Sequence, residues 1–187
     1  ETLVEAVLEL RKNEPSTCLL DLCSGSGCIP SALSVHLSGV TGAVLELSPE
    51  AMGYLRQNLK RHAPQLECIA GDVLHPPAEL LHRQFHIITC NPPYLTAADM
   101  EQLQPEVARE PETALFGGTD GLDFYRGFND IYPRMLAPGG LLLYEIGEEQ
   151  GEAVAALLRN AGLERVAILR DVYGQPRNVL GYAPDEN

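Results

Sequence analysis

Asp21-Leu22-Cys23-Ser24-Gly25-Ser26-Gly27 joins a short apolar run at 18–22 to a helical pattern that begins at Cys28. The two glycines allow a tight turn and let a ligand approach the backbone closely. A strand, a glycine loop and a helix in this order open many nucleotide-binding α/β folds. A glycine pair alone also occurs in plain strand–helix turns, so the rest of the chain must supply further signals.

Working outward from this loop, apolar runs and helical patterns alternate along the whole chain. We expect strands at 18–22, 43–47, 66–70, 85–90, 141–146, 166–170 and 179–183, and helices at 3–10, 28–37, 49–62, 122–136 and 148–161. Such alternation predicts a mostly parallel sheet covered on both faces. The connection at 171–176 is too short for a crossover helix, so the last two strands form an antiparallel hairpin. The long polar connection at 95–121 is typical of a functional segment.

Composition narrows the classes of function. The 187 residues include 26 acidic and 13 basic ones, a formal net charge of −13. This length suits one domain with a full core, and this charge disfavours sequence-independent binding to a phosphate backbone. We expect no membrane span, no signal peptide and no metal site, and we expect the five cysteines to be reduced thiols.

Acidic residues follow the second and third predicted strands. Glu46, 19 residues after the second loop glycine, can accept hydrogen bonds from ribose, and Asp72 can reach an adenine amino group. Either a dinucleotide or S-adenosylmethionine fits this arrangement. A dinucleotide loop would read Gly-x-Gly-x-x-Gly. If Gly25 and Gly27 are its first two glycines, Pro30 stands at the third position, and if Gly25 is its second glycine, Cys23 stands at the first. Asp21, just before the glycines, suits a ligand with an ammonium and a sulfonium, so the combination favours a methyltransferase.

Asn91-Pro92-Pro93-Tyr94 directly follows the predicted strand at 85–90. The asparagine side chain offers an acceptor oxygen. The prolines lack N–H groups and have fixed φ, so their carbonyls point outward from a stiff backbone. Two adjacent acceptors can hold both hydrogens of one planar NH2 group, and Tyr94 offers a flat face on which that group can stack.

Together these segments resemble the HemK/PrmC family of protein-glutamine methyltransferases, which modify the glutamine of the Gly-Gly-Gln motif in peptide-chain release factors. The resemblance covers essentially the whole chain. Its more specific elements are Glu106-Val107, Glu110-Pro111, Ala114-Leu115, the run 117–126, Glu145-Ile146-Gly147 with Gln150, and Asp171, Gly174, Arg177 and Gly181. DNA amino-methyltransferases share Asn91-Pro92-Pro93-Tyr94 but lack this longer signature.

The resemblance implies a Rossmann-like class I S-adenosylmethionine-dependent methyltransferase with a mostly parallel seven-stranded sheet. It implies that 1–187 form the methyltransferase domain, with 1–14 as a leading helix and linker remnant, and that the family's N-terminal helical domain is absent from this chain. It also implies release factors as partners, S-adenosylhomocysteine as product, and a monomer in a bacterial-type cytoplasm or an organellar matrix. Direct contact with nucleic acid or membrane is not expected.

Residue roles carried over from the family fall into two sets. The cofactor-binding set is Asp21, Cys23, Ser24, Gly25, Gly27, Glu46, Leu47, Asp72, Val73 and Asn91. Asn91, Pro92 and Tyr94 would be catalytic, and together with Pro93 they would bind the substrate glutamine. Two positions depart from the family, because Glu46 replaces a frequent Asp and Cys23 replaces a frequent Gly.

Two other functions remain open at this point. A nucleic-acid methyltransferase acting on the exocyclic amine of adenine or guanine would use the same acceptor pair, although the charge of the chain argues against it. A module that binds the cofactor without catalysis would not need Asn91. We expect no side chain to act as an obligatory base, and we expect His86, within the strand at 85–90, to be a packing or surface residue.

Overall fold

The computed structural model describes residues 1–11, 13–14 and 16–185 of the chain. The helices are α1 (Thr2–Arg11), α2 (Cys28–His36), α3 (Pro49–His62), α4 (Ala97–Met100), α5 (Asp123–Asn129) and α6 (Gly151–Asn160). Short 3₁₀ helices are η1 (Val107–Arg109), η2 (Glu112–Ala114) and η3 (Tyr132–Met135). The strands are β1 (Thr17–Leu22), β2 (Val40–Glu46), β3 (Leu66–Ala70), β4 (Phe85–Cys90), β5 (Leu136–Glu145), β6 (Glu164–Arg170) and β7 (Pro176–Tyr182).

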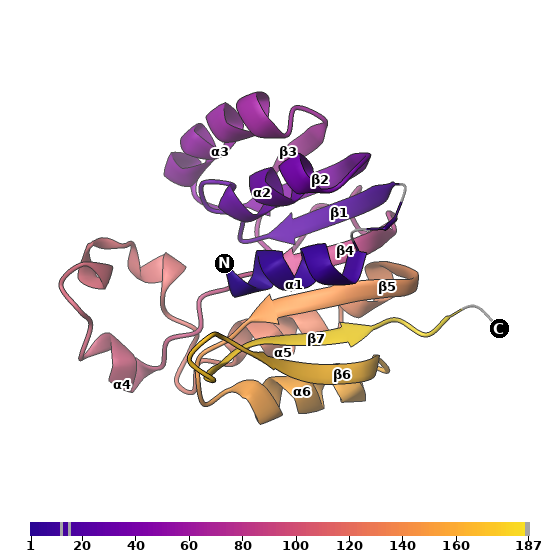
Figure 1. The fold of residues 1–187 in the computed structure, drawn as a ribbon. Coiled ribbons are helices and arrows are strands. Elements are labelled where there is room, and N and C mark those ends of the chain that lie inside the picture. The colour runs from indigo at the N-terminus through magenta and orange to yellow at the C-terminus, as the bar shows by residue number, and fades with distance from the viewer. Residues whose placement is uncertain (12, 15, 186–187) are drawn as a thin grey trace.

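These strands form one sheet in the order β3-β2-β1-β4-β5-β7-β6 (Figure 1). β1 to β5 pair in parallel, and β7 runs antiparallel to both β5 and β6. This arrangement confirms the predicted mostly parallel sheet with a C-terminal hairpin.

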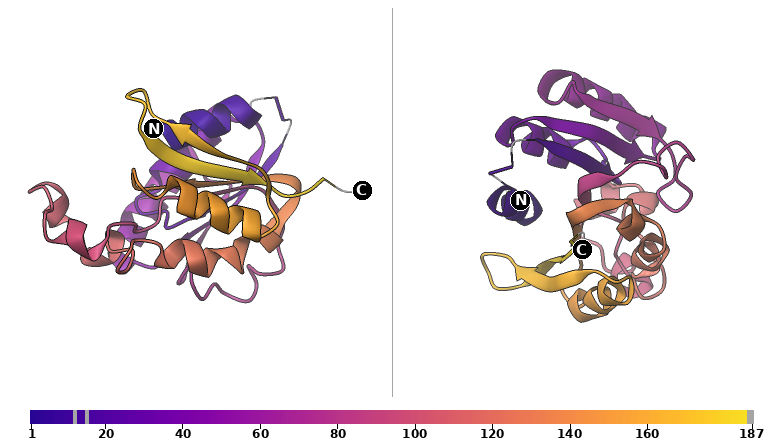
Figure 2. Two further views of the ribbon diagram at one scale, coloured as in Figure 1. Left: turned by 90° about the horizontal axis from the view of Figure 1, so that it is seen from below. Right: turned by 90° about the vertical axis from the view of Figure 1, so that its right-hand side faces the viewer.

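Helices cover both faces of the sheet, as the two views in Figure 2 show. One face packs against α1, α2 and α3, and the other against α5 and α6. Successive residues of β5 alternate between the two apolar clusters: Leu141 and Leu143 lie in the first, and Leu142 and Tyr144 in the second. Strands buried on both faces are almost continuously apolar, which explains why the sequence marked them clearly.

Two boundary predictions were wrong. The helix expected at 122–136 stops at Asn129 and is followed by η3, because Pro133 cannot extend an α-helical hydrogen-bond ladder. The strand expected at 141–146 begins earlier, at Leu136, so Pro138-Gly139-Gly140 lies inside β5. Gly139 adopts a φ of 65° there, and the register with β4 shifts between Phe85 and Ile87. The strand therefore absorbs the glycines as a local irregularity.

The sheet order reverses between β1 and β4, where ligands of open α/β folds usually bind at the carboxyl ends of the strands. The segment 95–121, which we call the lobe, contains α4 and projects beyond these ends (Figure 1). Among the residues that the structure describes, no helix is long and apolar enough to cross a membrane.

Candidate active site

The glycine loop after β1 is a tight turn held by its own backbone. Gly25 and Gly27 have φ of 55° and 82°, in the left-handed region that favours glycine. A Cβ on Gly27 would lie 2.6 Å from the side chain of Leu55, so this position also needs a small residue. Cys23 has a φ of 52°, which few residues other than glycine adopt. The loop therefore forms a tight turn with a cysteine in a conformation that favours glycine.

Glu46 ties this loop to the start of α3. Its Oε2 accepts a hydrogen bond from Gly25 N at 2.7 Å, and its Oε1 accepts one from Ser48 N at 2.7 Å. The residue is 8% exposed, yet each carboxylate oxygen keeps a second acceptor site. Leu47, which follows it, is 62% exposed. Glu46 is therefore already fixed in a position from which it can accept further hydrogen bonds.

Asp21, at the end of β1, is a fully buried carboxyl group. Its Oδ1 accepts a hydrogen bond from Thr89 Oγ1 at 2.6 Å, whereas its Oδ2 has no partner in the described part of the chain. Burial raises the pKa of Asp21 to about 7, and the hydrogen bond from Thr89 only partly opposes this. A buried carboxylate with an unpaired oxygen is stabilised by a nearby cation. This chemistry fits the ammonium or sulfonium of S-adenosylmethionine.

Asp72 and Val73 follow β3. Asp72 accepts hydrogen bonds from Leu74 N at 2.8 Å and from the His75 ring at 2.9 Å. Partial burial works against ionisation, but these hydrogen bonds outweigh it and leave the pKa of Asp72 below its ordinary value. Val73 is buried and its carbonyl accepts a hydrogen bond from Tyr132. These hydrogen bonds fix the backbone directly after β3.

Asn91-Pro92-Pro93-Tyr94 leaves β4 at the same edge of the sheet. Asn91 is exposed, the two prolines are buried, and Tyr94 is half-buried. Within 1–11, 13–14 and 16–185, neither the Asn91 side chain nor the Pro92 carbonyl makes a hydrogen bond. Asn91 and Pro92 line the neighbouring cleft, and their acceptor oxygens are free to bond a ligand there.

His86 lies near the opposite end of β4 from Asn91. Its Nδ1 accepts a hydrogen bond from Cys18 N at 2.9 Å. This contact supports the interpretation of His86 as a surface residue that stabilises the start of the strand pair.

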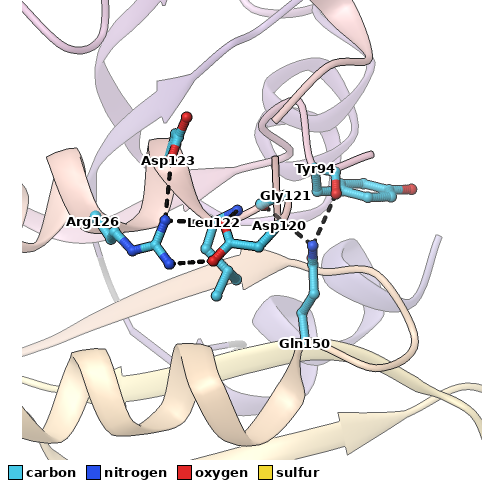
Figure 3. A network of polar contacts seen from close by, with 7 residues as sticks. All are labelled: Tyr94, Asp120, Gly121, Leu122, Asp123, Arg126 and Gln150. Carbon is cyan, nitrogen blue, oxygen red and sulfur yellow. Dashed lines mark hydrogen bonds and ion pairs between the residues drawn. The ribbon is translucent and has the colours of Figure 1, made fainter. Parts of the chain in front are cut away.

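Gln150 joins three segments behind the Asn91–Tyr94 turn (Figure 3). Its Nε2 donates hydrogen bonds to the carbonyls of Tyr94 at 2.8 Å and Gly121 at 3.2 Å, and its Oε1 accepts one from Gly147 N at 2.9 Å. Sequence reasoning had marked Gln150 only as part of the family signature. Its structural role is to hold the end of the lobe against the turn.

The glycines near the end of the lobe make this close approach possible. A Cβ on Gly117 would lie 2.7 Å from Pro93 O, and one on Gly121 would lie 2.3 Å from Tyr94 O. On the outer side, Arg126 bridges Asp120 and Asp123, as Figure 3 shows. The run 117–126 therefore closes the lobe onto the turn.

The structure thus brings together the predicted residues from the ends of β1, β2 and β4. Thr89, which sequence reasoning did not single out, contacts Asp21 from the neighbouring strand. The sequence did contain a signal for this contact. Thr89 and Asp21 are polar residues in two buried apolar strands, and a buried polar side chain requires a hydrogen-bond partner.

Comparison with known proteins agrees with this geometry. Residues 3–116 match the family model of the methyltransferase small domain. The chain belongs to the methyltransferase small domain family. Its seven-stranded α/β fold is that of class I S-adenosylmethionine-dependent methyltransferases, as predicted.

Relatives within this family carry a more specific name. The chain is 40% identical to a release factor glutamine methyltransferase of Cereibacter sphaeroides over 98% of its own length, and 37% identical to one of Geobacter sulfurreducens over 97%. It spans 64% and 62% of these two relatives, less than two thirds of their length. A solved protein-(glutamine-N5) methyltransferase, described as release factor-specific, from Alicyclobacillus acidocaldarius aligns with a TM-score of 0.60 at 26% identity. That alignment covers 98% of this chain and 90% of the solved one.

Proposed function

We propose that this methyltransferase domain transfers a methyl group from S-adenosylmethionine to the side-chain amide nitrogen of a glutamine in peptide-chain release factors. The observation that carries the proposal is the pair of free acceptors, Asn91 Oδ1 and Pro92 O, on a stiff turn beside the glycine loop. The names of the relatives support the same reaction. The target would be the glutamine of the Gly-Gly-Gln motif, and the second product would be S-adenosylhomocysteine.

The residues at the ends of β1 to β3 fit the cofactor. Asp21 would face its positive charge, since the unpaired Oδ2 is buried there. The left-handed backbone of the glycine loop, residues 23–27, would lie against its methionine part. Glu46 would accept hydrogen bonds from the ribose hydroxyls with its remaining lone pairs. Leu47, Asp72 and Val73 would surround the adenine, and Asn91 would complete the site.

When bound, S-adenosylmethionine supplies an electrophilic methyl group on a sulfonium. The chain must supply orientation, because the lone pair of an amide nitrogen is delocalised into its carbonyl. Hydrogen bonds from both N–H groups to Asn91 and Pro92 would fix that nitrogen and favour the positive charge that it develops. Pro93 stiffens the turn, and Tyr94 would pack against the glutamine side chain. Positioning then accounts for much of the rate. No side chain is needed as a strong base, because the positively charged methylated nitrogen is acidic enough to release its proton to water.

A direct assay separates the candidate functions. The chain is incubated with methyl-labelled S-adenosylmethionine and either a purified release factor or total tRNA and DNA. We expect label in the protein only, and a mass increase of one methyl group on the Gly-Gly-Gln peptide. Label in nucleic acid alone would favour the exocyclic-amine enzyme, and cofactor binding without transfer to any substrate would favour a non-catalytic module.

A further inference from the structure

The acceptor pair opens into a cleft that is larger than a glutamine side chain requires. The cleft has a volume of about 660 Å³, within the range of roughly 300–1,000 Å³ that accommodates a drug-sized ligand. Asn91, Pro92 and Tyr94 form one part of its wall. The residues expected to bind the cofactor at the ends of β1, β2 and β3 do not line it. The remaining space is therefore available to other parts of a substrate.

The rest of the wall comes from the lobe. Its apolar lining residues are Leu95, Ala98, Leu103, Val107, Ala114 and Leu115. The base of the lobe is closed by hydrogen bonds from Leu95 N to Leu115 O and from Gly117 N to Leu95 O, both 2.9 Å long. Thr96 and Asp99 form a capping box at the start of α4. The cleft is thus bounded by an ordered, internally bonded segment.

Charge in the lobe is strongly one-sided. Residues 96–121 contain six acidic side chains and one basic side chain, Arg109. Two of the acids, Asp99 and Glu110, line the cleft. Thr96 N and Thr96 Oγ1 both donate hydrogen bonds to the Asp99 carboxylate. Glu110, by contrast, has no ion pair or side-chain hydrogen bond within the described ranges of the chain. It is the cleft acid with full capacity to accept hydrogen bonds from a ligand.

Glu110 also lies close to the turn that would hold the target amide. The pKa of Tyr94 is raised mainly by burial and then by Glu145, with Glu110 adding to the shift and Arg177 opposing it. Arg177 lines the cleft as well, but it is paired with Asp171 at 3.3 Å. A cationic group in the cleft would therefore meet an unpaired carboxylate, and Asp171 offsets the charge of the arginine in the same lining.

We propose that the cleft binds the residues flanking the target glutamine in the protein substrate, and that Glu110 selects a lysine or arginine among them. This inference rests on the proposed function and deepens it, because it names the chemistry of the segment that accompanies the glutamine. The apolar lining of the cleft packs against the backbone and aliphatic groups of the substrate residues beside the glutamine. The acids of the lining, Asp99 and Glu110, attract the cationic side chain.

The test is a double-mutant cycle between enzyme and substrate. Methylation kinetics are measured for an intact release factor and for versions in which each Lys or Arg within four residues of the target glutamine is replaced by Gln. We expect Glu110→Gln to raise KM roughly three- to tenfold, in line with the loss of a charge-assisted contact, and to change kcat by less than about twofold. One of the substrate substitutions should raise KM by a similar factor, and the combination should add little further.

A matched control and a reversal make the outcome decisive. Glu112→Gln removes an exposed acid of the same lobe that does not line the cleft, and KM should stay unchanged. Glu110→Arg should recover affinity for a substrate in which the selected cation is replaced by Glu. If the glutamine is methylated normally and KM responds neither to Glu110 nor to flanking charge, the inference is overturned while the proposed function stands. If no glutamine is methylated in any release factor, the proposed function fails and the inference fails with it.

Discussion

The carboxyl ends of β1 and β2 use their polar groups in a different way from the carboxyl end of β4. At β1 and β2, Asp21 and Glu46 are buried and bonded to Thr89, Gly25 and Ser48. At β4, the Asn91 side chain and the Pro92 carbonyl make no hydrogen bond in the described part of the chain. The first region is organised by internal contacts, whereas the second presents acceptors to whatever enters the cleft.

This difference corresponds to two tasks. A cofactor site must recognise a constant ligand, so its acceptors can be fixed by the protein's own backbone and still offer lone pairs. An amide-holding site must leave its acceptors free, so its rigidity has to come from elsewhere. Here proline geometry and the hydrogen bonds of Gln150 provide that rigidity. Substitutions in the two regions should therefore separate binding of the cofactor from transfer of its methyl group.

The largest effect is expected at Asn91. Replacing Asn91 with Ala removes one of the two acceptors and should lower the rate of methyl transfer by about 10²-fold or more, as for other preorganised polar groups. Cofactor affinity, measured by calorimetry, should change little, because the main cofactor contacts lie at other strand ends. Asn91→Asp serves as a control, because it keeps an acceptor at the same position. Normal methylation by Asn91→Ala would refute the acceptor-pair model.

The next effect is expected at Gln150, which lies outside the cleft lining. Gln150→Ala leaves the carbonyls of Tyr94 and Gly121 without their donor, and losses of this kind cost about 1–3 kcal/mol. We expect kcat to fall by roughly 10- to 100-fold through misplacement of the turn. Gln150→Glu is nearly isosteric but cannot donate a hydrogen bond, so its kcat should fall by a similar factor. An equal loss of cofactor affinity in both variants would mean that the two regions are not independent.

The cofactor region should respond to pH through Asp21. Its pKa is about 7 in the free protein because burial disfavours the ionised form. A cationic ligand binds the ionised form, so binding releases a proton and affinity rises with pH. Between pH 6 and pH 8 the ionised fraction changes about tenfold, and affinity should change by roughly the same factor.

Asp21→Asn is the matched control for this dependence. Because asparagine cannot ionise, the cofactor affinity of this variant should not show the tenfold change between pH 6 and pH 8. Any remaining pH dependence should come from the amino group of the ligand. Calorimetry at several pH values measures both proteins directly. Identical profiles for wild type and Asp21→Asn would show that the carboxylate does not face the ligand's charge.

Much of the fold could be read from the sequence, because its strands are short apolar runs separated by glycine and proline. The errors arose where local signals compete with the sheet. Pro138-Gly139-Gly140 is a normal turn sequence, yet pairing with β4 extends β5 back to Leu136. Pro133 indicated a break in the helix expected at 122–136, but the strong apolar pattern around it concealed that signal.

The candidate site divides in the same way. Residues that follow strands, such as Glu46 and Asn91, could be predicted because parallel strands bring their carboxyl ends to one edge. Thr89 carried a signal as a polar residue in a buried strand, but its partner and those of Gln150 lie on segments distant in sequence, so neither role could be assigned. Hydrogen bonds of this kind depend on tertiary packing, and no local pattern encodes them. Glu110 likewise became distinct from the other acids of the lobe only when the cleft was visible.

The smallest effect is expected at Arg126 in α5, which forms an exposed ion pair with Asp120 near the end of the lobe. It bridges Asp120 and Asp123, but its side chain is 49% exposed, and exposed ion pairs contribute little because water and salt screen them. Arg126→Ala should therefore change kcat/KM by less than about threefold and leave the midpoint of urea unfolding nearly unchanged. Arg83→Ala, which removes the distant Arg83–Glu67 pair, serves as a control. If Arg126→Ala reduced transfer as strongly as Gln150→Ala, the lobe would be held by its outer charges rather than by Gln150. The conclusion that Gln150 supplies the rigidity of the Asn91–Tyr94 turn would then be wrong.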